Sequence, residues 1–586
     1  MLPAPVQMQW GVKIPLRDGI YLNATLYILP GRNTPMPCVM TLTPYIGQMW
    51  HQFAVYFAAH GYPFLTVDCR GRGNSEGIFA PFIHEAFDGY DAVEWVAHQP
   101  YCNGQVAMWG GSYGGFDQWA TAAECPPHLA TIVPVASVAP GHDFPLRNNV
   151  ASPYMMQWLT LVSGRTSQER MFFEAPEFWS SQFRDWFEGG TPFRGLDAFL
   201  GNPSEIFQEW ICHPKQGQYW DSRNPASRKL GKLSVPVLTI TGIYDSDQPG
   251  ALMYYRQHLA DTSIEARSHH YLVIGPWDHS CTRVARAEFG GLKVGPASVI
   301  DLPKLHLQWY AWTMQGGLKP PFLKKNVAYY VTGVEKWRYA DTLDAITARL
   351  EPLYLQSSGS PVDVFHSGTL VGDLPIECEP DQYVYDPHDI ESAELESMID
   401  PYNLTDQRLV FAKTGKQLIY HSAPFERDTE ITGFFRLHVW LSIDRPDTDF
   451  RVAVYVIDLD GSSILLCADW LRARYRVSLR EERLINTSEP LPYKFERFTF
   501  ISRRIRRGQR LRLVIGPINS IYSQKNYNSG GVVAEESVHD ARPVTVVLYH
   551  DQAHPSALYV PYAVPESSDE VEASICVNDI LATEAK

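Results

Sequence analysis

The chain has 586 residues, which suits two to four domains at about 150 residues each. With 45% hydrophobic and 20% charged residues it has the composition of a globular protein, and a mostly disordered chain is excluded. The net charge of -15 argues against a nucleic-acid-binding protein, because such proteins present basic surfaces.

The cysteines and the N-terminus indicate where the protein resides. The nine cysteines are scattered, odd in number and never form a CxxC pair, which favours a reducing compartment over a disulfide framework. Residues 1–8 contain neither a basic region nor an apolar core of a signal peptide, and no run of about 18 apolar residues occurs. We therefore predict a cytoplasmic protein with no nucleic-acid or membrane partner.

The first part of the chain alternates between strand-like and helix-like segments. Short apolar, β-rich runs predict strands at residues 38–42, 64–67 and 106–109, each followed by a predicted helix at about 49–60, 86–98 and 113–123. Strands resume at 237–240 and 271–274. This alternation predicts a mostly parallel sheet flanked by helices.

Residues 141–231 interrupt the alternation. They are dense in tryptophan and phenylalanine and have no clear strands, which predicts a helical insertion between two halves of one α/β domain. The aromatic side chains form either a small core of the insertion itself or the apolar wall of a substrate pocket.

The last part of the chain alternates with the period of two that is typical of strands. The clearest runs are 435–441, 451–456, 510–515 and 544–549. Many short strands separated by Gly, Asp and Pro predict a β-sandwich or jelly roll. The predicted organisation is thus an α/β domain of residues 1–140 and 232–350, a helical cap of residues 141–231 and an all-β domain of residues 351–586.

The strongest local motif is Gly-Gly-Ser-Tyr-Gly at residues 110–114, between a predicted strand and a predicted helix. This G-x-S-x-G pattern is typical of a nucleophile elbow, a sharp turn that lifts the hydroxyl of Ser112 out of the sheet. The backbone N–H of Tyr113, at the start of the helix, can then donate to an oxyanion. The alternative is a tight glycine turn without catalytic function.

A serine nucleophile needs a general base, and the base needs an orienting carboxylate. In the α/β-hydrolase order both follow the serine, first the acid and then the histidine. Asp245 follows the predicted strand 237–240, and His279 follows 271–274. Asp247 and Asp278 compete with Asp245, although Asp278 adjoins the histidine and is poorly placed to orient its ring.

Several segments resemble the cocaine esterase/α-amino acid ester hydrolase family, which also includes X-prolyl dipeptidyl-peptidases. They are Thr-Pro-Tyr at 43–45, Asp-Cys-Arg-Gly-Arg-Gly-Asn-Ser-Glu-Gly at 68–77, Gly-Gly-Ser-Tyr-Gly-Gly at 110–115, Tyr-Asp at 244–245, Gly-Pro-Trp-Asp-His at 275–279, Pro-Asp-Thr-Asp-Phe at 446–450 and Leu-Arg-Ala-Arg-Tyr-Arg at 471–476. The matches run almost from end to end. The resemblance implies an α/β-hydrolase domain with a helical cap and a C-terminal jelly roll.

The resemblance also implies roles for three residues. The position of Tyr45 matches a tyrosine whose hydroxyl contributes to the oxyanion hole of the family. The amino ester hydrolases bind the substrate ammonium with clustered carboxylates, and here Asp247 and Asp143 match in part, while Gln248 replaces a carboxylate. Solvated or capping roles for Asp247 and Asp143 are the alternative.

These residues together predict a serine hydrolase that cleaves an ester or amide through an acyl-enzyme. Ser112 is the nucleophile, His279 the base and Asp245 the orienting acid, with Tyr45 and Tyr113 as the oxyanion hole. The expected substrate is a small ester, amide or short peptide, and no cofactor or metal is expected, because no HExxH motif or cysteine cluster is present. One alternative is an X-prolyl dipeptidyl-peptidase, and another is a non-catalytic binding protein that uses the jelly roll. Jelly-roll edges leave room for a homo-oligomer, but no residue requires one.

Overall fold

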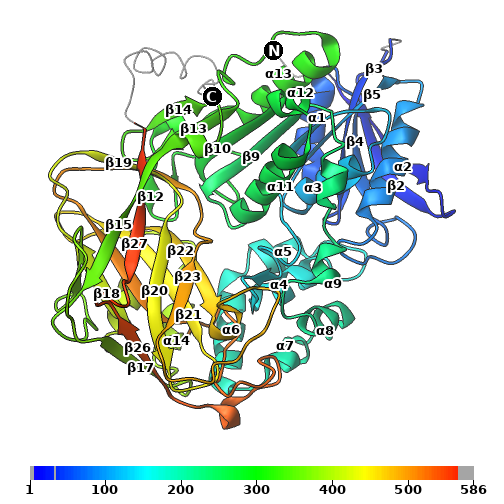
Figure 1. Cartoon of the computed structure of the whole chain (residues 1–586). Helices are drawn as coiled ribbons and strands as arrows, with labels where there is room; N and C mark the ends of the chain where they lie inside the picture. The colour runs from blue at the N-terminus through cyan, green and yellow to red at the C-terminus, as the bar shows by residue number, and fades with distance from the viewer. Residues whose placement is uncertain (1–4, 32–33, 565–586) are drawn as a thin grey trace.

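The computed structural model describes residues 5–31 and 34–564 (Figure 1). A ten-stranded sheet has the order β1-β2-β4-β3-β5-β6-β9-β10-β13-β14. Its strands are β1 (Gln7–Pro15), β2 (Tyr21–Ile28), β3 (Met36–Thr43), β4 (Phe64–Asp68), β5 (Cys102–Gly111), β6 (Leu129–Val135), β9 (Val237–Tyr244), β10 (His270–Asp278), β13 (Val327–Val331) and β14 (Lys336–Ala340). The strands from β4 to β13 are parallel, and β1, β2 and β14 add antiparallel edges.

Helices cover both faces of this sheet. The helices are α1 (His51–Ala59), α2 (Glu85–Ala97), α3 (Tyr113–Ala123), α11 (Gln248–Asp261), α12 (Ile264–Ser268) and α13 (Leu302–Gln315). Ring contacts join α1 to α13 through Phe57 and Tyr310, and α3 to α11 through Trp119 and Tyr254. The predicted parallel sheet with flanking helices is confirmed.

The N-terminal hairpin β1–β2 was not apparent from the sequence. Its first strand has mostly exposed or half-exposed side chains, so the apolar run that marks the inner strands is missing. Helix α1 begins two residues later than predicted, because residues 47–50 form a 3-10 turn.

Between β6 and β9 the chain forms short helices, drawn in cyan to green in Figure 1. They are α4 (Tyr154–Leu161), α5 (Glu169–Phe173), α6 (Pro176–Gly189), α7 (Leu196–Phe199), α8 (Glu205–Ile211), α9 (Gln218–Asp221) and α10 (Ser227–Leu230). The prediction that this region has no strands is wrong in one place, where β7 (Leu146–Arg147) pairs with β8 (Val150–Ala151). Strands of two residues are too short to show an alternating pattern.

The aromatic side chains of this insertion form a buried cluster that reaches the helix after the serine turn. Trp158 and Trp210 stack on one another, and Trp158 also stacks on Tyr113 with ring centroids 5.7 Å apart. Phe82, from the loop before α2, stacks on the same tryptophans. The aromatic residues are thus largely core, and they join the insertion to α3.

The C-terminal part is a 13-stranded, mostly antiparallel sheet. Its apolar core is continuous with side chains of β9, α11, β10 and β13 in the α/β domain. Its strands are β15 (Thr347–Gln356), β16 (Gly368–Val371), β17 (Asp381–Tyr385), β18 (Leu418–Ser422), β19 (Thr429–Gly433), β20 (Arg436–Ile443), β21 (Asp449–Ile457), β22 (Ser463–Arg472), β23 (Leu491–Phe495), β24 (Ile501–Ile505), β25 (Arg510–Pro517), β26 (Val544–Tyr549) and β27 (Ala557–Ala563). Four smaller elements are β11 (Glu288–Phe289), β12 (Leu292–Lys293), α14 (Ala393–Ser397) and α15 (Arg408–Ala412). The predicted all-β C-terminal domain is confirmed as a fold class. Its exact limits, and those of the other domains, stay predictions, and residues 565–586 lie outside the described part.

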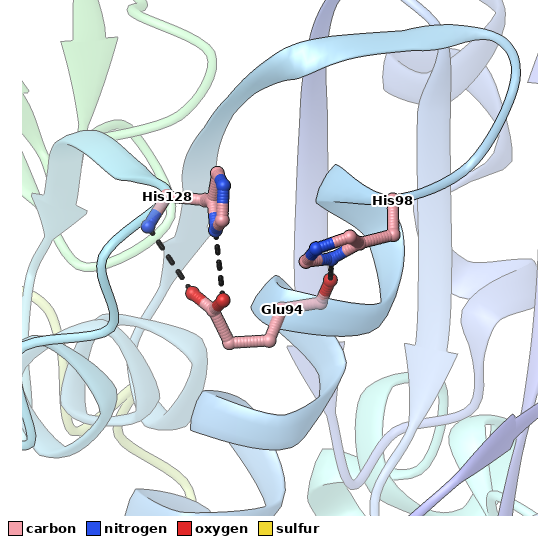
Figure 2. Close-up of side chains that lie close together, drawn as sticks. All are labelled: Glu94, His98 and His128. Carbon is pink, nitrogen blue, oxygen red and sulfur yellow. Dashed lines mark hydrogen bonds and ion pairs between the residues drawn. The ribbon is translucent and has the colours of Figure 1, made fainter.

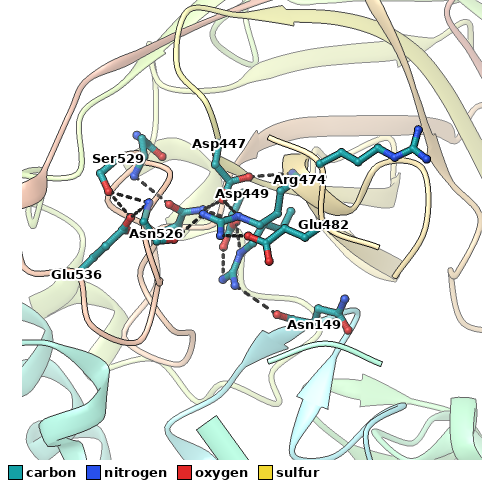
Figure 3. Close-up of polar contacts among 12 residues, drawn as sticks. Asn149, Asp447, Asp449, Arg474, Glu482, Asn526, Ser529 and Glu536 are labelled. Atoms are coloured by element: carbon teal, nitrogen blue, oxygen red, sulfur yellow. Dashed lines mark hydrogen bonds and ion pairs between the residues drawn. The ribbon is translucent and has the colours of Figure 1, made fainter. Parts of the chain in front are cut away.

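Buried polar contacts join the β-domain to the rest of the chain. Figure 3 shows the cluster around Asp447 and Asp449, where Arg472 pairs with Asp449 through N–O distances of 2.8 and 2.9 Å. Arg472 also donates to the backbone carbonyl of Asn149, in the turn between β7 and β8. At a second junction the amide of Gln248, at the start of α11, donates to and accepts from the backbone of Phe500. The β-domain therefore packs directly against the segments that carry the candidate site.

Two further observations concern the helices and the cysteines. No helix within the described ranges is both long and apolar enough to cross a membrane. The cysteines of these ranges are all free thiols.

Candidate active site

Ser112 lies in the strained turn that the motif predicts. It joins β5 to α3 with φ 61° and ψ -121°, in a region that residues with a side chain rarely occupy. The turn is crowded on the side of the glycines, since a Cβ on Gly115 would lie 2.5 Å from the hydroxyl of Ser137. The side chain of Ser112 is half-buried rather than enclosed in the core.

The hydroxyl and the backbone N–H of Tyr113 have different surroundings. Its hydroxyl lies inside the protein, where it donates to Glu85 and accepts from the backbone N–H of Phe82 at 2.8 Å. Its backbone N–H begins α3, so no carbonyl of an earlier helical turn can accept from it. This N–H therefore has no partner from within the helix, and its role as an oxyanion donor stays a prediction.

The structure brings His279 and Asp245 together. Nδ1 of His279 lies 2.8 Å from Oδ1 of Asp245. The Asp245 side chain is fully buried, and Thr241 donates its hydroxyl to Oδ2 at 2.9 Å. Asp247 is farther from the ring, with Oδ2 3.7 Å from Nδ1, and Asp278 instead accepts the backbone N–H of Cys281. Of the three aspartates that the sequence leaves open, Asp245 thus has the best hydrogen-bonding geometry toward the ring.

Charge interactions in this cluster favour a charged histidine. Burial alone would lower the pKa of His279, but the charges of Asp247 and Asp245 outweigh that effect and raise it. Burial likewise acts to raise the pKa of Asp245, but the charge and hydrogen bond of His279 lower it. The pair therefore suits a base that gains a proton while the acid stays ionised.

Ser112 and His279 form no hydrogen bond with each other; each has a different neighbour. The Oγ of Ser112 lies 3.5 Å from Oδ2 of Asp247, and Nε2 of His279 lies 3.4 Å from Nη2 of Arg283. Catalytic hydrogen bonds are often long or misaligned in unliganded sites and shorten when substrate binds. The bond that a serine nucleophile requires thus needs a local side-chain movement here.

Tyr45 follows β3, and its hydroxyl interacts with that of Ser112. Its buried hydroxyl accepts a hydrogen bond from Nε1 of Trp158 at 3.1 Å. Burial raises the pKa of Tyr45 to about 12, partly offset by hydrogen bonds with Trp158 and Ser112. The phenol is therefore protonated at neutral pH and can donate to an oxyanion.

Asp247 and Asp143, which the sequence suggests as an ammonium site, lie in one electrostatic cluster. Burial and the charge of Asp247 raise the pKa of Asp143 well above its usual range. Both oxygens of Asp143 accept backbone N–H groups, from Ala139 at 2.8 Å and Gly250 at 2.7 Å. Burial also raises the pKa of Asp247. Both carboxylate oxygens of Asp143 are thus already used in backbone hydrogen bonds, whereas Asp247 is half-buried and lies 3.5 Å from the serine hydroxyl.

Two arginines at the site were not singled out as candidate site residues from the sequence, although Arg72 lies in the family-like segment 68–77. Arg72 is fully buried and donates to the carbonyls of Pro44, Val162, Gly164 and Thr166, which ties the turn before Tyr45 to the end of α4. Arg283 comes shortly after His279 in the loop that follows β10, and its guanidinium lies against Gly111. Neither belongs to a periodic pattern, and only the folded loops bring them to the serine.

Two groups of three side chains among the described residues have the donor atoms for a metal ion, all within 4.8 Å of one another. One is Asp245, Asp247 and His279, where Nδ1 of the histidine already bonds to Asp245. The other consists of Glu94 on α2, His98 directly after α2 and His128 before β6 (Figure 2). There His128 bonds to the Glu94 carboxylate at 2.7 Å and His98 to the Glu94 carbonyl at 2.7 Å. Internal hydrogen bonds account for both arrangements.

Comparisons with known proteins agree with this architecture. The family model of the X-Pro dipeptidyl-peptidase (S15 family) matches residues 18–281, and that of the X-Pro dipeptidyl-peptidase C-terminal non-catalytic domain matches residues 323–558. The chain is 25% identical to the cocaine esterase of Rhodococcus sp. (strain MB1 Bresler), covering 94% of this chain and 97% of that protein.

Solved structures show the same fold. An aminopeptidase from a marine sediment Thaumarchaeota archaeon superposes with a TM-score of 0.80 at 20% identity, covering 96% of this chain and 97% of that one. An α-amino acid ester hydrolase superposes with a TM-score of 0.80 at 19% identity and the same coverage. The predicted α/β-hydrolase fold with a C-terminal β-domain is thereby confirmed.

Proposed function

Since the chain belongs to the serine hydrolase family that contains cocaine esterase, α-amino acid ester hydrolases and X-Pro dipeptidyl-peptidases, we propose that Ser112, His279 and Asp245 are its catalytic triad. The observation that carries the proposal is the 2.8 Å contact between Nδ1 of His279 and the buried Asp245, beside a serine in a strained strand-to-helix turn. The protein is an enzyme that cleaves an ester or amide through an acyl-enzyme, which excludes the binding-protein alternative.

In the proposed mechanism Ser112 attacks the acyl carbonyl while Nε2 of His279 accepts its proton. Asp245 holds the ring and stabilises the imidazolium. The tetrahedral oxyanion accepts hydrogen bonds from the Tyr45 hydroxyl and the Tyr113 N–H. His279 then protonates the leaving group, and afterwards it activates a water that releases the acid from Ser112. Binding must first bring Ser112 and Nε2 of His279 into contact.

We further propose that the preferred substrates carry an α-amino group close to the scissile carbonyl. Asp247 lies 3.5 Å from the serine hydroxyl, and its charge adds to those of Asp143 and Asp245. An ammonium group near Asp247 would relieve the repulsion among these carboxylates. We do not expect Asp143 to contact the ammonium group directly, because its oxygens already accept two backbone N–H groups.

The test compares kcat/KM for an aromatic α-amino ester and the same ester without its amino group. Ser112→Ala serves as the blank and Asp247→Asn as the variant that removes the proposed ammonium contact. We expect the amino group to raise kcat/KM at least about tenfold in the wild type, or about 1.4 kcal/mol, and much less in Asp247→Asn. An amino group without effect would refute ammonium recognition and leave a general esterase.

An X-Pro dipeptidyl-peptidase is the second candidate, favoured by the two family models and by the same carboxylates, since that reaction must hold a free N-terminus. X-Pro anilides distinguish it from an ester hydrolase. Hydrolysis of the anilides with kcat/KM comparable to that of the amino ester would establish the peptidase.

We also propose that the enzyme works in the cytoplasm on small substrates. The free thiols of the described residues support a reducing compartment. Fractionation of the native host, with the activity expected in the cytoplasmic fraction, tests this.

A further inference from the structure

Arg283 is a partly buried cation beside the catalytic histidine, and among the described residues it has no carboxylate within ion-pair distance. Its guanidinium lies flat against the backbone of Gly111, since a Cβ there would fall 2.6 Å from Nε and 3.0 Å from Cζ. Nη1 donates to the carbonyl of His279 at 3.0 Å, whereas the buried Nε has no hydrogen-bond partner.

This arrangement differs from that of Arg72, whose buried guanidinium is satisfied by four backbone carbonyls. Buried charges are normally paired, because desolvation of an unpaired charge is costly. Asp245 and Asp247 act on Arg283 only through longer-range charge interactions, so its guanidinium is left without a directly paired anion among the described residues.

The position of Arg283 also conflicts with catalysis as the unliganded site stands. Nη2 lies 3.4 Å from Nε2 of His279, the atom that must accept the proton of Ser112. A guanidinium at this point donates a hydrogen bond to Nε2, so that the nitrogen cannot accept the proton of Ser112. Its positive charge also opposes formation of the imidazolium. Both effects would disappear if the guanidinium paired with an anion instead.

We propose that Arg283 binds a carboxylate of the substrate, placed a few bonds from the scissile carbonyl. The carboxylate accepts a hydrogen bond from Nη2 of Arg283 in place of His279. Nε2 of His279 is then free to bond to Ser112, and the carboxylate neutralises the positive charge beside the imidazolium. The enzyme thus prefers anionic esters or amides, either with the carboxylate on the acyl side or with it on the leaving group. The proposal rests on the proposed function and adds a substrate class to it.

The experiment uses two matched pairs of esters with the uncatalysed rates subtracted. The first pair is phenyl hydrogen glutarate and phenyl glutaramate, in which the acyl side carries a carboxylate or the corresponding neutral amide. The second pair is 3-carboxyphenyl acetate and 3-carbamoylphenyl acetate, in which the leaving group carries the carboxylate or the amide. In the wild type the anionic member of at least one pair should have a kcat/KM about tenfold to a hundredfold higher, the range for a hydrogen bond to a charged group. This ratio should fall as ionic strength rises.

Arg283→Met should abolish that ratio, and Arg283→Lys should retain part of it. Arg286→Met is the matched control, because Arg286 is an exposed arginine of the same segment, and it should keep the wild-type ratio. With the neutral esters, Arg283→Met should move the acid limb of kcat/KM to higher pH, since removal of the cation raises the pKa of His279, which faces Asp245, Asp247 and Arg283.

Three results would overturn the proposal. The first is a ratio of kcat/KM between the anionic and the neutral ester that is near one in both pairs for the wild type; this result can be obtained without any variant. The second is a ratio that Arg283→Met leaves intact. The third is an equal loss with anionic and neutral esters, which would make Arg283 an oxyanion group instead. If the wild type hydrolyses the aromatic α-amino ester of the first test but none of these four esters, only this proposal is overturned. If it hydrolyses none of the five in a Ser112-dependent manner, the proposed function fails as well.

Discussion

Replacing Tyr45 by Phe removes one oxygen from the proposed oxyanion hole and keeps the ring. The phenol lies at the end of β3, where it accepts from Trp158 at 3.1 Å and keeps its own hydrogen for donation. Loss of one oxyanion donor costs about 100-fold to 1000-fold in kcat, or about 2.7–4 kcal/mol. Because the Tyr113 N–H remains, we expect kcat to fall within that range while KM changes little.

The same substitution has a structural cost that can be measured separately. The indole N–H of buried Trp158 loses its acceptor, which costs about 1–3 kcal/mol of stability. Trp158→Phe is the matched control, because it breaks the same hydrogen bond and keeps the phenol. Thermal unfolding should show both variants destabilised, whereas only Tyr45→Phe should lose most of its kcat.

The assay is steady-state hydrolysis of one ester by both variants, with unfolding followed in parallel. A loss in kcat below about tenfold for Tyr45→Phe would refute the role of the phenol as an oxyanion donor. Equal losses of kcat in the two variants would assign the effect to packing around Trp158.

Two further predictions concern electrostatics. Asp247→Asn removes the largest charge effect that raises the pKa of His279. The acid limb of the pH profile of kcat/KM should therefore move to lower pH. A limb that stays in place or moves to higher pH would contradict this. Asp449→Asn leaves the buried Arg472 without its ion pair and should lower the free energy of unfolding by about 3–5 kcal/mol, whereas Asp221→Asn, which breaks the exposed pair with Arg480, should cost no more than about 1 kcal/mol. Denaturant unfolding of both variants checks this, and similar losses would show that burial of the pair does not matter.

The inner strands and the serine turn could be predicted because their cause is local. β3, β4 and β9 are buried on both faces and read as continuous apolar runs, and the turn at Ser112 needs glycines on both sides. The edge strand β1 has no such run, since most of its side chains face solvent.

The choice between Asp245 and Asp247 could not be made from spacing, because both follow β9 closely. The fold separates them through burial and through the hydroxyl of Thr241, which donates to Asp245. Arg283 could not be predicted at all, because its proximity to His279 depends on how the loop after β10 turns back over Gly111. Contacts of this kind arise only from tertiary packing.

The central claim is that Ser112 carries the acyl group, and a serine-reactive phosphonate tests it most directly. Peptide mass spectrometry of the treated enzyme should find one label per chain on Ser112, no label in Ser112→Ala and much slower labelling in His279→Ala. A label on another residue, or ester hydrolysis by Ser112→Ala at the wild-type rate, would contradict the account.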